Sequence, residues 1–60
     1  MNLDEEERRA TEMLVGRTVR LVRRHHAKEV MVEFTDGTRL FVDAQIDRVA
    51  LSITGDVANE

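Results

Sequence analysis

From Arg17 onward, apolar side chains recur at every second position, and this period constrains the fold more than any other feature of the chain. A period of two is typical of half-buried β-strands, in which successive side chains point to opposite faces of a sheet. Short polar turns separate the segments, which favours antiparallel pairing of neighbours. The pattern predicts strands over residues 17–24, 30–35, 38–43 and 48–54.

The turn after Phe34 contains Asp36 and Gly37, and its length decides which side chains share a face. A two-residue turn would pair Phe34 with Arg39 and mix charge into the better apolar face. A three-residue loop, with Gly37 in the left-handed conformation, pairs Phe34 with Thr38 and keeps that face apolar. We therefore predict the three-residue loop. Its further pairs are Val30 with Val42, Val32 with Leu40, Met31 with Phe41, and Glu33 with Arg39.

Residues 3–15 are expected to form a helix, because Asn2 can cap its first turn and Gly16 can end it. The predicted fold class is α+β, with this N-terminal helix packed on a four-stranded antiparallel β-meander. The alternative is a small SH3-like or Lsm-like β-barrel with the same N-terminal helix. Residues 1–60 are expected to form a single domain with a loose tail at 55–60.

A chain of 60 residues buries only about 60% of the surface that its unfolded form exposes, so its stability is marginal. No cysteine is present to supplement the core with a disulfide. The predicted apolar face is also larger than the helix can cover, so we expect either a homodimer or a sheet that curls on itself. The face carries Val19, Leu21, Val30, Val32, Phe34, Leu40, Val42, Val49, Leu51 and Ile53, whereas the helix offers Leu3, Ala10, Met13 and Leu14.

Basic side chains are unevenly placed in this chain, whose net charge is −3. A basic island without any acidic residue comprises Arg17, Arg20, Arg23, Arg24 and Lys28. Nucleic-acid or anion binding by this island is therefore the alternative function. Strict alternation would separate Arg20 and Arg24 on one face from Arg23 on the other, and no Tyr or Trp is available to stack on bases. The commoner role of such charges is to protect an edge strand.

No motif predicts catalysis, a cofactor or a metal site. His25 and His26 are adjacent on a predicted turn, where neighbouring side chains usually diverge. The glycines are too scattered for a phosphate-binding loop. The acidic N-terminal residues do not resemble a secretory signal, and no apolar run approaches the roughly 20 residues of a membrane span. We therefore expect a cytoplasmic protein that is not an enzyme and that has no cofactor, metal or membrane contact.

The second face of the predicted sheet is expected to carry apolar side chains from all four strands. A contiguous apolar group on a small domain indicates a contact surface, although long arginine stems could cover it instead. The predicted interaction surface consists of Val22, Met31, Phe41 and Ala50. We therefore expect a small protein-interaction domain whose partner is a second copy of the chain or another protein.

Overall fold

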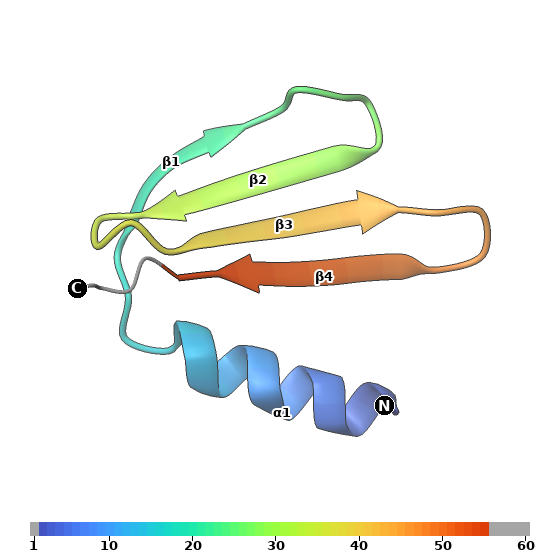
Figure 1. The fold of residues 1–60 in the computed structure, drawn as a ribbon, viewed down its shortest axis with the longest axis horizontal. Helices are drawn as coiled ribbons and strands as arrows, with labels where there is room; N and C mark the ends of the chain where they lie inside the picture. The colour runs from blue at the N-terminus through green and yellow to red at the C-terminus, as the bar shows by residue number, and fades with distance from the viewer. Residues whose placement is uncertain (1, 56–60) are drawn as a thin grey trace.

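The structure is a computed structural model that describes residues 2–55. It contains a helix, α1 (Leu3–Leu14), followed by the strands β1 (Val19–Arg23), β2 (Glu29–Phe34), β3 (Arg39–Ala44) and β4 (Val49–Thr54). The strands form an open antiparallel sheet in the order β1-β2-β3-β4 (Figure 1). The predicted α+β fold is therefore confirmed, and the barrel alternative is wrong. Residues 56–60, most of the predicted tail, lie outside the described residues.

Both ends of α1 are defined by capping contacts. The side-chain oxygen of Asn2 accepts a hydrogen bond from the backbone N–H of Glu5 at 2.7 Å, as expected of an N-cap. After the helix, Gly16 adopts a left-handed conformation with φ +84°. Arg17 was expected to open the first strand. Instead, its Nε donates to the carbonyl oxygen of Met13 at 2.6 Å, so it satisfies a last-turn carbonyl and β1 begins only after it.

The β2–β3 hairpin has the predicted three-residue loop. The N–H of Gly37 donates to the carbonyl of Phe34 at 3.0 Å, and the N–H of Phe34 donates to the carbonyl of Thr38 at 2.8 Å. Gly37 has φ +93°, in the left-handed region that favours glycine. The predicted register is therefore confirmed. The pairs along the strands are Val30 with Val42, Met31 with Phe41, Val32 with Leu40, and Glu33 with Arg39.

This register divides the sheet into two faces. The helix face is the one from which Leu51 and Ile53 approach α1, and the far face is the one that carries Met31 and Phe41. Residues that pair directly across antiparallel strands point to the same side of the sheet. Pairing therefore places on the helix face Val30, Val32, Phe34, Leu40, Val42 and Val49.

An irregularity in β1 between Val19 and Leu21 overturns part of the predicted alternation. Leu21 pairs with Glu33 and therefore lies on the far face, although it was expected among the core side chains of the helix face. Val22 pairs with Val32 and lies on the helix face, although it was expected on the far face. A β-bulge inserts one extra residue into a strand, and this shifts every later side chain to the opposite face.

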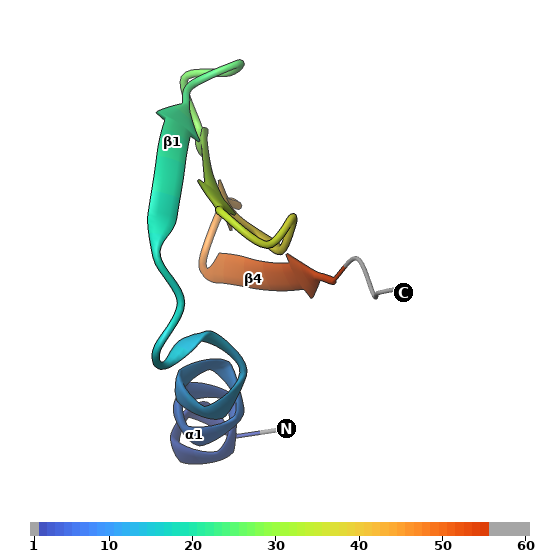
Figure 2. The same cartoon turned by 90° about the vertical axis from the view of Figure 1, so that its left-hand side faces the viewer.

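Little of this sheet is sealed from solvent. Among residues 2–55, the buried apolar side chains are Met31 and Phe34, each 6% exposed. The helix runs alongside β4 (Figure 1), and Figure 2 shows it below β4 rather than across the centre of the twisted sheet. No residue of α1 is buried, while Val19, Val22 and Val49 on the helix face are more than half exposed. The helix therefore covers only the β4 side of its face.

We predict that Gly37→Val destabilises the domain by more than about 1 kcal/mol, because a β-branched residue is strained at positive φ. Gly37→Asn should cost less, since asparagine tolerates the left-handed conformation better than other residues. Urea unfolding of the two variants and the wild type at one protein concentration measures both losses. Equal stability of Gly37→Val and the wild type would contradict the observed turn geometry.

We also predict that Phe34→Ala costs about 3 kcal/mol or more, as expected when a buried aromatic side chain is removed. Phe41→Ala should cost less, because Phe41 lies on the far face and is only partly buried. Thermal and urea unfolding of the two variants checks the ranking. Equal losses would show that the far face contributes as much to stability as the helix face.

Candidate functional site

The far face carries a shallow, open groove of about 470 Å³. We call it the far-face groove. Three arginines surround an apolar floor, and the side chains come from β1, β2, β3 and the β1–β2 loop. The lining consists of Arg20, Leu21, Arg23, His25, Met31, Glu33, Arg39 and Phe41.

Glu33 lies in the middle of this groove, between two arginines. One carboxylate oxygen, Oε2, lies 3.3 Å from Nε of Arg20, and the other, Oε1, accepts a hydrogen bond from Nε of Arg39 at 3.2 Å. The Glu33 side chain is 14% exposed, whereas about half of each arginine side chain is exposed. Two guanidinium groups share one carboxylate, so the groove retains positive charge, to which Arg23 adds.

Two members of the basic island, Arg17 and Arg24, contact other segments of the same chain. Arg17 forms an ion pair with Asp36 in the β2–β3 loop, in addition to its contact with the end of α1. Arg24 donates two hydrogen bonds of 2.8 Å, from Nε to the carbonyl of Glu29 and from Nη2 to the carbonyl of Ala27. Arg24 therefore holds the β1–β2 loop. These contacts connect segments of the chain, so the basic island is not one continuous binding patch.

Arg20 and Arg23 are the island residues that line the far-face groove, and Lys28 lies outside its lining. The bulge in β1 brings the two arginines together, although strict alternation predicted opposite faces for them. Arg39, the third arginine of the groove, is far from the island in sequence. The predicted pairing of Arg39 with Glu33 was the signal that could have placed it there.

The predicted interaction surface is divided by the structure. Met31 and Phe41 pair directly and form part of the groove floor. Ala50 lies on the same face, opposite Asp43, but outside the groove lining. Val22 lies on the helix face, so its assignment to this surface was wrong because of the bulge. Leu21 lies on the far face instead, opposite Glu33, and Arg23 pairs with Met31.

Within the described part of the chain, the histidine pair does not form a metal centre with other side chains. His25 lines the rim of the far-face groove, and its ring centroid is 6.5 Å from that of His26. Within residues 2–55, no three His, Cys, Asp or Glu side chains come together as candidate metal ligands. The same part of the chain contains no helix that is long and apolar enough to cross a membrane.

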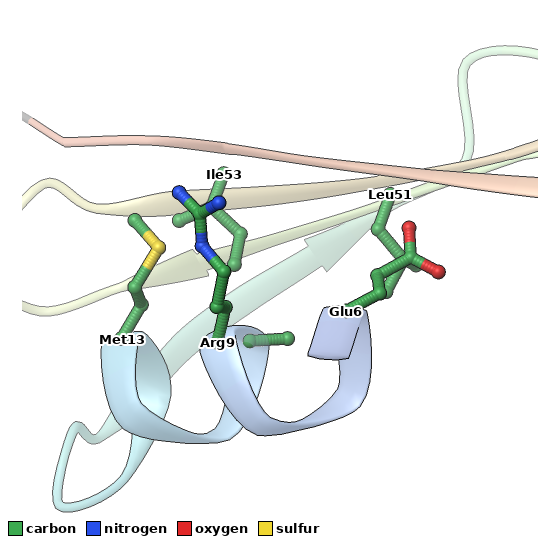
Figure 3. A pocket seen from close by; sticks show the side chains of 6 residues that line it. Glu6, Arg9, Met13, Leu51 and Ile53 are labelled. Atoms are coloured by element: carbon green, nitrogen blue, oxygen red, sulfur yellow. The ribbon is translucent and has the colours of Figure 1, made fainter. Parts of the chain in front are cut away.

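The helix face offers a second candidate surface, where α1 meets β4. Figure 3 shows Met13 and Arg9 extending from α1 toward Leu51 and Ile53 of β4. A gap of about 160 Å³ remains there, lined by Glu6, Arg9, Ala10, Met13, Leu51 and Ile53. Leu3, which is 80% exposed, lies along a neighbouring hollow on this side of the molecule. The helix therefore packs loosely on β4.

No protein-family model matches this chain, and neither a curated protein nor a solved structure is significantly similar to it.

Neighbouring hydrogen-bond donors shift the pKa of Asp36. Its Oδ1 accepts the backbone N–H of Thr38 at 3.0 Å. This hydrogen bond, together with the Thr38 hydroxyl and the Arg17 guanidinium, lowers the pKa of Asp36 below its usual 3.8 and outweighs partial desolvation. A carboxylate with a depressed pKa stabilises the fold above its unfolded-state pKa, and that contribution is lost as pH falls through the folded-state pKa.

We therefore predict that the stability difference between the wild type and Asp36→Asn is largest near neutral pH and shrinks below about pH 4. The asparagine amide oxygen can still accept the Thr38 N–H, so the variant chiefly removes the charge. Urea unfolding of both proteins between neutral pH and about pH 3 measures this difference. A difference that grows on acidification would contradict the assigned direction of the pKa shift.

Proposed function

We propose that this chain is a small cytoplasmic protein-interaction domain, not an enzyme, and that it associates with a second copy of itself through the helix face. The main support for the proposal is that the single chain buries few of its apolar side chains. Among the described residues, Met31 and Phe34 alone are buried apolar side chains, although 42% of the sequence is hydrophobic.

Most of the exposed large apolar side chains among residues 2–55 belong to α1, β1 and β4, and the others, Val15 and Ile46, lie in connecting segments. Val22 and Val49 are 57% and 56% exposed, and Leu51 is 37% exposed on the strand that faces the helix. Burial of apolar surface stabilises a protein by about 25 cal/mol per Å². A 60-residue domain has little stability to spare, so covering this face is a substantial gain.

A twofold homodimer is the simplest arrangement that covers such a face, because the same surface then meets its own copy. The apolar side chains at the α1–β4 gap and on β1 would form the centre of the contact. Most of the charged residues of α1 are exposed and would surround it, while Glu6 and Arg9 line the gap itself. This agrees with the usual organisation of interfaces, in which an apolar centre is enclosed by a polar rim.

The alternative function, nucleic-acid or anion binding by the Arg17–Lys28 island, has less support. Arg17 and Arg24 are engaged in contacts within the chain, which leaves fewer arginines for phosphates. The far-face groove also contains Glu33, and beside the His25 imidazole it offers Phe41 as its one phenylalanine. Sequence-independent nucleic-acid binding usually combines several phosphate contacts with aromatic stacking.

We predict that the mass measured by light scattering with size exclusion rises from 6.9 kDa toward twice that value over a hundredfold increase in concentration. The melting temperature should rise over the same range, because association stabilises the folded state. Val49→Glu should hold the protein at the single-chain mass, since it places a charge on the exposed helix face without disturbing a buried site.

The matched control is Ser52→Glu, which adds the same charge to the opposite face of β4. This variant should associate like the wild type. A single-chain mass for the wild type at every concentration, with a constant melting temperature, would rule out self-association. Equal effects of Val49→Glu and Ser52→Glu would show that the helix face is not the contact.

A further inference from the structure

We infer that the far-face groove binds an acidic peptide segment of a partner protein and that an apolar side chain of this segment occupies the groove floor. The inference rests on the proposed function as a protein-interaction domain, and it names the partner chemistry that the second face accepts. It does not depend on self-association, because the groove lies on the face opposite to the proposed dimer contact.

The charge of the groove is opposite to that of the protein as a whole. The chain carries −3, yet Arg20, Arg23 and Arg39 line the groove with Glu33 as its one acidic residue. A local positive site on an acidic protein attracts a negatively charged segment at short range, while the overall charge disfavours indiscriminate binding of polyanions. The site therefore favours a short acidic segment.

Two of the three arginines of the groove, Arg20 and Arg39, are held in position before any ligand arrives. Arg20 and Arg39 both contact Glu33 through Nε, at 3.3 and 3.2 Å, which leaves the Nη donors of both guanidinium groups for another acceptor. Within residues 2–55, Arg23 forms no ion pair. Guanidinium groups bind carboxylates through paired N–H donors, so these side chains suit Asp or Glu of a ligand.

The floor of the groove favours a peptide over a nucleic acid. Leu21 and Phe41 are partly exposed and provide an apolar base around Met31, which is 6% exposed. A leucine, isoleucine or phenylalanine of the ligand gains from burial on such a base. Nucleic-acid sites instead offer several aromatic rings for stacking, whereas the whole chain contains two phenylalanines and no tyrosine or tryptophan.

The experiment selects binders from a displayed library of random twelve-residue peptides on immobilised wild-type protein and, in parallel, on Arg23→Glu. Peptides enriched on the wild type alone should be rich in Asp and Glu and contain a large apolar residue. Fluorescence anisotropy of the enriched peptides in solution should then show binding that Arg23→Glu weakens at least about tenfold. Replacement of the apolar residue of the peptide by serine should also weaken binding severalfold.

Arg48→Glu is the matched control, because Arg48 is exposed and lies outside the groove. It makes the same charge reversal and should change peptide affinity less than about twofold. Arg23→Ala, which removes the charge without reversing it, should give an intermediate loss. Arg23 is exposed and holds no buried group, so both variants should retain the melting temperature of the wild type.

Three results would overturn the inference. In the first, the wild type enriches no peptide that Arg23→Glu does not also enrich. In the second, the peptides enriched on the wild type lack acidic residues. The third is tighter binding of a random twelve-nucleotide single-stranded RNA pool than of the enriched peptides, with the same dependence on Arg23. Light scattering of the same protein distinguishes a failure of the peptide-binding inference from a failure of the proposed self-association, because the oligomeric mass does not depend on the groove.

Discussion

The three-residue loop between β2 and β3 is the local constraint on which the two faces of the sheet depend. Gly37 accepts a positive φ, which fixes the loop length and so the pairing of the strands on either side. A shift of one residue would exchange the two faces of the paired strand. The pairing of Glu33 with Arg39, and of Met31 with Phe41, follows directly from this turn.

The hairpin and the helix could be predicted from the sequence because each is determined by contacts between residues that are close in the chain. Asn2 caps α1 from one turn away, and Gly37 acts within a loop of three residues. The bulge in β1 could not be predicted in this way. Its register depends on how β1 meets β2 across a longer connection, and the sequence VRLVR is compatible with either face pointing inward.

The same limitation explains which parts of the candidate site were predicted. Met31 and Phe41 were expected together because they pair across the hairpin, and they do pair. Val22 was misplaced because its side depends on the bulge, which also brings Arg20 and Arg23 into one groove. The position of α1 beside β4 depends on tertiary packing. The apolar stripe of the helix indicates a contact with the sheet but does not say where on the face it lies.

Alternation along the strands lets one thin sheet carry two surfaces of different chemistry. The helix face is apolar, and a contact that buries apolar surface is not weakened by added salt. The far-face groove would attract an acidic peptide through its arginines. Salt screens exposed charges over a Debye length of about 10 Å at 0.1 M. Added salt should therefore weaken peptide binding at the groove without weakening self-association through the helix face. Because Glu33 is 14% exposed and holds two of the arginines, screening should reduce ligand attraction before it disturbs the groove itself.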